Sequence, residues 1–290
     1  MKKICLAAVA LVTMWACEKE IPLKQDEAEP RIVVNGLFQA EDTVWIQLSE
    51  SRNVLYKEEL PNITNATAQL LDKNSNVLGD FTHDTDGRYY VPGVFPVAGE
   101  TSGLNVSAPN LKSVKATSEA PSLLSDFTVD TVAAPNDELE FTIRFQDDPD
   151  QINYYGISIT YFGTWINEFG EEEMYQDSYI STKEFYVTNG EEDVDGTKYA
   201  QEFFFSDASL NGQMITFKAR KYNYEFEDSG FFKIQVKSLS EDASKYKVSY
   251  AKYLEVQGSP FAEPVQVYSN IEDGFGIFGG ISAVKDTIWR

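Results

Sequence analysis

The sequence contains a single histidine, His83, and two cysteines, Cys5 and Cys17, in 290 residues. One histidine makes a Ser-His-Asp triad implausible and excludes a multi-histidine zinc site. Two cysteines exclude a disulfide framework. Most catalytic equipment is therefore missing, and what remains is ligand binding, a structural role or chemistry done by carboxylates.

Basic residues are also scarce, with 24 Lys and Arg against 46 Asp and Glu and a net charge of -22. Such a surface repels phosphate, so nucleic acid is not an expected partner. The 42% hydrophobic and 13% aromatic content is enough to form a sizeable core. The composition therefore indicates a folded protein and excludes disorder.

The N-terminus has the pattern of a secretory signal. Lys2 and Lys3 precede an apolar run at residues 4–15 that is too short to span a bilayer, and Ala16 and Cys17 follow. A cysteine directly after a small residue is where bacterial lipoproteins are cleaved and acylated, so we expect a signal peptide at residues 1–16 and a lipid on Cys17. Two or three acyl chains would give stable membrane anchoring. The alternative is an ordinary signal peptide that leaves Cys17 as a free thiol.

Residues 17–30 are rich in acids and contain two prolines, which suits a flexible tether. Beyond it, apolar and polar residues alternate, for example through Leu139, Phe141, Ile143 and Phe145. This period of two predicts half-buried strands, and turns such as Asn211-Gly212 separate them. We expect an all-β protein of two sandwich domains, immunoglobulin-like or transthyretin-like, at residues 31–121 and 122–290. Acid-rich segments at residues 165–180 and 189–198 are expected as long loops.

One segment departs from the strand pattern. Ser240 is a good N-cap, Glu241 and Asp242 suit a first helical turn, and Gly258 is a stop signal. Tyrosines at 246, 250 and 253 follow at helical spacing, although part of the run also alternates like a strand. We predict one short helix here, near the C-terminus.

Paired carboxylates could support hydrolysis, but the acidic clusters lie in segments where solvated charge is the commoner explanation, so no catalytic residue is predicted. Two Asp-x-Asp-Gly strings are weak calcium candidates, at Asp84 and Asp86 and at Asp193 and Asp195. Neither string has the other ligands of a complete calcium loop, and a β-turn explains both equally well. No cofactor is expected.

Three Asp-Thr-aliphatic tripeptides resemble O-glycosylation sites of exported Bacteroidota proteins, at Thr43, Thr131 and Thr287. His83 beside the first Asp-x-Asp-Gly string is expected to be a surface residue. Exposed aromatic residues such as Trp165, Tyr222 or Tyr224 could instead form a sugar-binding or protein-binding face. The sequence does not assign ligand-binding residues.

The segment at residues 260–280, Pro-Phe-Ala-Glu-Pro-Val-Gln-Val-Tyr-Ser-Asn-Ile followed by a glycine-rich run, resembles the closing signature of a family of Bacteroidota outer-membrane lipoproteins. This is domain-of-unknown-function family 4249. Cys17-Glu18-Lys19-Glu20, Asp86-Gly87-Arg88-Tyr89-Tyr90 and residues 149–155 fit the same pattern. One departure follows Gly99-Glu100, where the family usually has a Tyr-x-Leu-x-Val strand. The acids behind Cys17 also resemble the signal that sends such lipoproteins to the outer face of the outer membrane.

The resemblance implies a lipid-anchored outer-membrane protein that faces the cell exterior and is not an enzyme. It further implies an accessory or substrate-capture partner of a TonB-dependent transporter barrel. The alternatives are a stand-alone carbohydrate- or peptide-binding lipoprotein and a structural or adhesin protein of the envelope.

Overall fold

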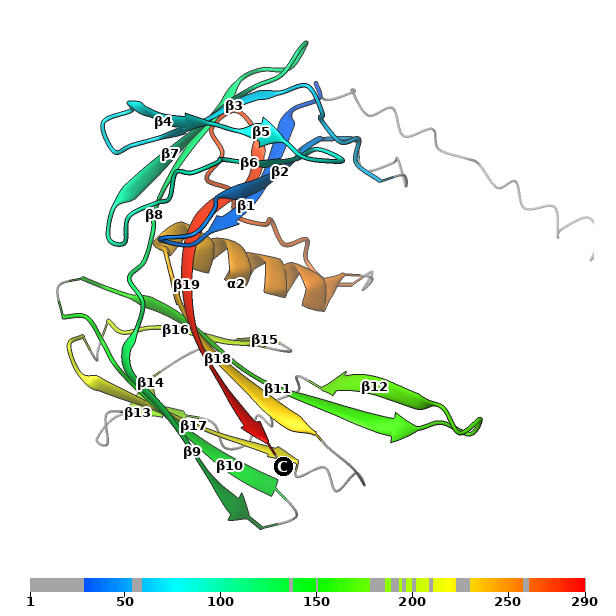
Figure 1. The fold of residues 1–290 in the computed structure, drawn as a ribbon, viewed down its shortest axis with the longest axis vertical. Coiled ribbons are helices and arrows are strands. Elements are labelled where there is room, and N and C mark those ends of the chain that lie inside the picture. The colour runs from blue at the N-terminus through cyan, green and yellow to red at the C-terminus, as the bar shows by residue number, and fades with distance from the viewer. Residues whose placement is uncertain are drawn as a thin grey trace, which may run out of the picture.

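The computed structural model describes residues 29–53, 59–135, 138–149, 151–177, 186–188, 193–194, 197–199, 202–208, 211–222, 230–257 and 261–289. Within these ranges the chain is mostly strand, with one helix near the C-terminus. The predicted all-β sandwich fold is therefore confirmed. Figure 1 shows two lobes along the long axis of the molecule, with the N-terminal strands in one lobe and strands β9 to β18 in the other.

The N-terminal lobe is a sandwich of two sheets around one core. One sheet contains the first part of β19 followed by β1 (Ile32–Phe38), β2 (Trp45–Glu50), β6 (Arg88–Tyr90) and β5 (Thr82–His83). The facing sheet contains β4 (Val77–Asp80), β3 (Thr67–Leu71), β7 (Thr101–Ser107) and β8 (Val114–Glu119). Alternate residues point inward, so that Val34 and Leu48 from one sheet and Leu70 and Leu104 from the other share the buried core.

The C-terminal lobe repeats this design with larger side chains. One sheet contains β14 (Asp193–Val194), β13 (Tyr186–Thr188), β17 (Met214–Tyr222), β10 (Glu138–Gln146) and β9 (Ser125–Ala134). The other contains β15 (Thr197–Tyr199), β16 (Glu202–Ser206), β11 (Tyr154–Ile166), β18 (Phe231–Leu239) and the second part of β19, with β12 (Glu172–Asp177) beside β11. Phe141 and Phe232 meet edge to face across this core, with ring centroids 5.1 Å apart.

The prediction of a long loop at residues 165–180 is wrong for residues 165–177, which the structure describes. Strand β11 continues to Ile166, and β12 returns beside it after a turn at residues 167–170. The Asn167 side chain accepts hydrogen bonds from the backbone N–H groups of Phe169 and Glu171, which closes the turn. Glu172 and Glu173 lie in a strand of this hairpin and are exposed.

A single strand, β19 (Phe275–Trp289), belongs to both lobes. Its first six residues pair in parallel with β1, ending at Gly280 opposite Phe38. From Ile281 onward it pairs antiparallel with β18, beginning opposite Leu239. The two sheets that contain β19, one in each lobe, are therefore one continuous sheet. This sheet crosses from one lobe to the other at residues 280 and 281 of β19 (Figure 1).

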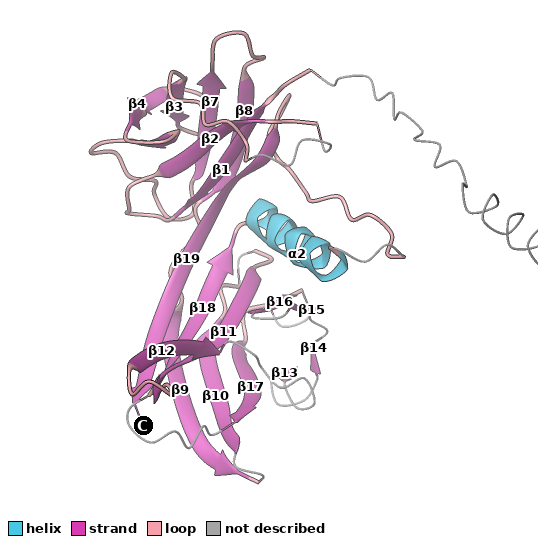
Figure 2. Ribbon diagram, turned by 90° about the vertical axis from the view of Figure 1, so that its right-hand side faces the viewer, coloured by secondary structure: helices cyan, strands magenta, loops and turns pink. Residues whose placement is uncertain are grey.

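The predicted helix is confirmed as α2 (Glu241–Val256), with Ser240 as its N-cap. Figure 2 shows α2 between the two lobes, beside β19. Its small residues Ala243 and Ala251 pack toward Leu37, Ile281 and neighbouring apolar side chains. Tyr250, Tyr253 and Leu254 are exposed, so the tyrosine spacing that favoured a helix does not mark its buried face.

Replacing Ser240 with alanine should lower the free energy of unfolding by about 1–2 kcal/mol. The Ser240 hydroxyl accepts the Ala243 N–H at 3.1 Å and lies 2.9 Å from the Ser118 hydroxyl, so both contacts would be lost. Urea denaturation followed by circular dichroism measures the effect. Ser107→Ala, at an exposed position on β7, is the control and should change the unfolding free energy by less than about 0.5 kcal/mol. If both substitutions changed the unfolding free energy equally, the stabilising role of the Ser240 side chain at the start of α2 would be contradicted.

Candidate functional site at the junction of the two lobes

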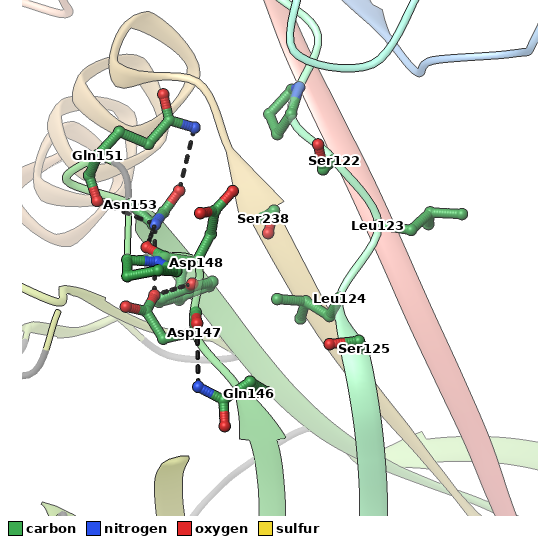
Figure 3. A pocket seen from close by; sticks show the side chains of 13 residues that line it. Ser122, Leu123, Leu124, Ser125, Gln146, Asp147, Asp148, Gln151, Asn153 and Ser238 are labelled. Atoms are coloured by element: carbon green, nitrogen blue, oxygen red, sulfur yellow. Dashed lines mark hydrogen bonds between the residues drawn. The ribbon is translucent and has the colours of Figure 1, made fainter. Parts of the chain in front are cut away.

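Two neighbouring cavities open where the lobes meet. The smaller has a volume of about 290 Å³, the larger has a volume of about 640 Å³, and both are lined in part by Pro121, Gln151 and Asn153. The smaller cavity, shown in Figure 3, is also lined by Ser122, Leu123, Leu124, Ser125, Gln146, Asp147, Asp148, Pro149, Tyr155 and Ser238. The larger cavity is also lined by Thr101, Thr117, Ser118, Glu119, Ile152, Tyr154, Leu239, Ser240, Glu241 and Asp242.

The segment that leads from the first lobe to the second forms one wall of both cavities. Strand β8 ends at Glu119 and β9 begins at Ser125, and this connection is fixed against β19. The Ser282 hydroxyl donates to the Pro121 carbonyl, and the Gly280 N–H donates to the Ser118 hydroxyl at 3.3 Å. The wall is therefore held by hydrogen bonds to the strand that both lobes share.

The opposite wall of the smaller cavity is organised by a buried carboxylate, Asp147, which is 2% exposed. It accepts hydrogen bonds from the Tyr155 hydroxyl and, at 2.6 Å, from the Gly212 N–H. Burial raises the pKa of Tyr155 above its ordinary value, and the hydrogen bond to Asp147 is the second-largest cause of this increase. Tyr155 is therefore a hydrogen-bond donor and not a general base.

A second carboxylate, Asp207, is fully buried beside the first. It accepts the backbone N–H of Asn153 at 2.8 Å, and the Asn153 amide lies 3.3 Å from both Asp207 and Asp147. The same amide is 3.0 Å from the Asp148 carbonyl oxygen and 3.2 Å from the Gln151 carbonyl oxygen. Asn153 therefore links the side chains of Asp147 and Asp207 to the connection between β10 and β11.

Burial and then the nearby charge of Asp147 raise the pKa of Asp207 to about 6. Because the folded-state pKa lies above the ordinary value of 3.8, neutral Asp207 contributes stability that is fully present below pH 3.8 and is lost as the pH rises to about 6.

Asp207→Asn keeps the acceptor for the Asn153 N–H and removes the ionisation. It should match the wild type near pH 4 and exceed its unfolding free energy by about 1 kcal/mol at pH 7. Urea titrations at both pH values measure the unfolding free energies. The prediction is contradicted if the difference between the variant and the wild type is the same at pH 4 and at pH 7.

The charge on the cavity walls has one sign. Asp147 and Asp148 line the smaller cavity, Glu119, Glu241 and Asp242 line the larger, and neither set of described lining residues contains Lys or Arg. In the larger cavity Glu241 is paired with Lys245 at 2.7 Å, and Asp242 accepts the Tyr268 hydroxyl at 2.5 Å. This lining favours cationic or neutral polar ligands and disfavours anions.

The predicted calcium candidates lie elsewhere. Asp84 and Asp86 lie in the turn between β5 and β6, where the Asp84 N–H bonds the Arg88 carbonyl at 2.9 Å and Gly87 has a φ of 77°. Asp195 and the side chain of Asp193 lie outside the part of the chain that the structure describes. Among the described residues, no group of three or more His, Cys, Asp or Glu could hold a metal ion.

The other predicted residues are scattered over the molecule. Thr287 is exposed on β19, whereas Thr43 and Thr131 are half-buried. His83 is exposed on β5, 5.0 Å from the Tyr89 ring. Cys17 and Tyr224 lie outside the described residues, as do the side chains of Trp165 and Tyr222.

Sequence reasoning missed Asp147, Asp207, Asn153 and Ser238 as lining or supporting residues of one site. Asn153 lies in residues 149–155, which the sequence marked only as similar to a family pattern. The signal that could have pointed to it is the density of polar residues in Asp147-Asp148-Pro149 and Gln151, directly between two alternating strands. Asp207 and Ser238 are distant in sequence, and only the paired strands bring them to this place.

The fold and the junction define a two-lobed, all-β protein with two cavities close to the place where its lobes meet. Residues 18–287 match the family described as Domain of unknown function (DUF4249). The chain therefore belongs to this family. No match appears among curated proteins.

Similarity to solved structures is weak. Bovine butyrophilin aligns with a TM-score of 0.21 at 9% identity, over 71% of this chain and 92% of that chain. The collagen-binding domain of Erysipelothrix rhusiopathiae surface protein RspB aligns with a TM-score of 0.24 at 10% identity, over 89% of this chain and 97% of that chain. At these scores neither similarity supports an argument about function.

No helix in the described part of the chain is long and apolar enough to cross a membrane.

Proposed function

We propose that the protein is a lipoprotein of the Bacteroidota outer membrane, anchored through Cys17 and exposed at the cell surface. In this proposal it is not an enzyme. It is an accessory of a TonB-dependent transporter barrel, and it captures substrate in the cavities between its lobes.

The observation on which the proposal depends is the N-terminal sequence. A basic start and a short apolar run lead to Ala16 and Cys17, and the acid-rich residues 17–30 follow. Membership of a family of unknown function is compatible with this role and does not specify it.

Charge supports a tethered arrangement. Removing residues 1–16 takes away Lys2 and Lys3 and no acid, so the mature chain has 22 basic and 46 acidic residues, a net charge of -24. An anionic membrane surface repels such a domain. Because the anchor confines the protein to the membrane plane, a modest interface would suffice for binding a barrel beside it.

The junction supports binding more than catalysis. The buried acids Asp147 and Asp207 are both engaged by fixed donors, the Tyr155 hydroxyl, the Gly212 N–H and the Asn153 amide and N–H. Carboxylates held in this way organise a wall and are not placed to attack a substrate or to exchange protons with it.

Cys17→Ser should move the protein from the membrane fraction to the soluble fraction, because the thiol that would receive the lipid is gone. Fractionation of cells and labelling with a palmitate analogue measure this. Protease added to intact cells should cleave the wild-type protein if the domain faces the exterior. Label incorporation that persists in Cys17→Ser would contradict the anchor. The barrel partnership is tested separately, by affinity purification of the membrane complex.

The cavities also fit the second candidate, a lipoprotein that binds a carbohydrate or peptide without a barrel. In that case ligand binding would be measurable in calorimetry, and purified membrane complexes would contain no transporter. A structural or adhesin role would instead show as altered surface integrity in a deletion strain, with no uptake defect.

A further inference from the structure

The β11–β12 hairpin projects from the body of the C-terminal lobe (Figure 1). Strand β18 pairs with β11 only as far as Phe162, whereas β12 pairs with β11 from Tyr161 to Ile166. Past Phe162 the hairpin is therefore a ribbon of two strands among the strands that the structure describes. Because a two-stranded ribbon gains little stability of its own, folding of the lobe does not explain why the hairpin extends so far.

The outer part of the hairpin exposes two large apolar side chains. Phe169 lies in the turn and is 80% exposed, and Met174 lies on β12 and is 77% exposed. Neither side chain contributes much to the core of the lobe. Aromatic side chains and methionine are enriched at protein interfaces, where burying them supplies much of the binding energy.

Hydrogen bonds fix the backbone that presents Phe169. The Asn167 side chain accepts the Phe169 N–H at 3.0 Å and the Glu171 N–H at 2.9 Å, and its amide donates to Glu173 at 2.8 Å. The Gly170 N–H donates to the Asn167 carbonyl at 2.9 Å, and Gly170 has a φ of 78°. The ring is thus presented from an ordered turn, which lowers the entropy lost when it is buried by a partner.

The charge around the tip has one sign. Residues 163–177 contain no Lys, Arg or His, and their acids are Glu168, Glu171, Glu172, Glu173 and Asp177. Acids around an apolar anchor favour a partner whose pocket is apolar and has Lys or Arg at its rim. They disfavour an anionic membrane surface, and they disfavour a second copy of this chain, whose net charge is -22.

We propose that the β11–β12 hairpin is a docking element and that Phe169 is its anchor, inserted into an apolar pocket of a protein partner with Lys or Arg at the rim. The partner is the outer face of the transporter barrel, so this inference rests on the proposed function. None of the described residues that line the two cavities belongs to the hairpin. Docking through the tip therefore fills neither cavity.

Affinity purification of the full, anchored chain through a C-terminal tag tests the anchor, with the amount of barrel per tagged protein as the readout. Phe169→Ser should lower this ratio about ten-fold or more, because one buried aromatic anchor can supply that much binding energy. Phe261→Ser is the control, since Phe261 is 96% exposed outside the hairpin, and it should leave the ratio unchanged. Both variants should melt at the wild-type temperature, because neither ring is packed in a core.

The charge argument is tested in the same purification. Glu172→Lys should lower the ratio several-fold, and added salt should lower it for the wild type, because both weaken attraction to a basic rim. Glu263→Lys makes the same charge change at an exposed position outside the hairpin and should have no effect. An equal effect of the two reversals would overturn the basic rim.

Photo-crosslinking identifies what the tip touches. A benzophenone amino acid replaces Phe169 in the full chain, the cells are irradiated, and the adduct is mapped by mass spectrometry. The expected adduct is with the barrel that the wild type recovers, at an apolar segment next to Lys or Arg. An adduct with lipid, with a second copy of this chain or with no molecule would overturn the proposal.

The purification separates the two claims. If the wild type and Phe169→Ser recover equal amounts of barrel, the docking inference fails and the proposed function stands. If the intact, anchored wild type recovers no barrel, the proposed function fails and the docking inference fails with it.

Discussion

Gly280→Ala is expected to lower the free energy of unfolding by at least about 3 kcal/mol. Gly280 is where β19 leaves β1 and joins β18, and its carbonyl accepts the Ser240 N–H at 2.9 Å. An added Cβ would overlap the carbonyl oxygen of Glu119 and come within 2.8 Å of the Pro121 ring. Because backbone atoms and a proline ring cannot rotate away as a long side chain can, the segment at residues 119–121 would have to move away from β19.

The matched control is Gly170→Ala in the turn between β11 and β12. Gly170 has a φ of 78°, and an added Cβ there would meet no atom within 4 Å. This substitution should cost only the conformational penalty of about 1–2 kcal/mol. Urea denaturation of both variants measures the difference. A cost at Gly280 no greater than at Gly170 would show that the crossing is not tightly packed.

Phe278→Ala is expected to cost about 3–5 kcal/mol and to weaken both lobes. Phe278 is fully buried in the N-terminal core and stacks on Phe38 with ring centroids 4.5 Å apart. Its strand continues directly into the C-terminal lobe as the partner of β18. Loss of the N-terminal core should therefore release one edge of β18. Hydrogen exchange of β1 and β18 amides, read by mass spectrometry, measures both lobes in one experiment.

Phe261→Ala is the control for Phe278→Ala, because Phe261 is 96% exposed and its loss should leave exchange in both strands unchanged. Faster exchange in β1 with unchanged protection in β18 would mean that the lobes unfold independently. That result would contradict the coupling that we derive from the shared strand.

Local structure was predictable because it depends on local patterns. Alternation through Leu139 to Phe145 became β10, with Phe141, Ile143 and Phe145 fully buried. The helix was predictable because its cap and acidic first turn are adjacent in sequence. The loop prediction at residues 165–180 failed because charge was taken as a sign of a loop, whereas exposed edge strands such as β12 also contain charged residues.

The sharing of β19 could not be predicted in the same way. Pairing of Val33 with Phe275 and of Phe231 with Trp289 depends on which distant strand lies beside each half, and period-two alternation contains no such information. The glycine-rich run within residues 260–280 likewise does not say which backbone lies against it, although the structure places Gly276 against Val34 and Gly280 against Glu119. The junction site was missed for the same reason, since Asp147, Asp207 and Ser238 meet only after the sheets are assembled.

Affinity purification of the membrane complex is the most direct test of the proposed role in transport. The full chain with a C-terminal tag would be isolated from gently solubilised outer membranes, and the proteins that co-elute would be identified by mass spectrometry, with Cys17→Ser as the control. The account predicts a TonB-dependent barrel in near-equal amount with the wild-type protein and much less of it with Cys17→Ser. Recovery of the intact, membrane-anchored protein with no barrel protein would contradict it.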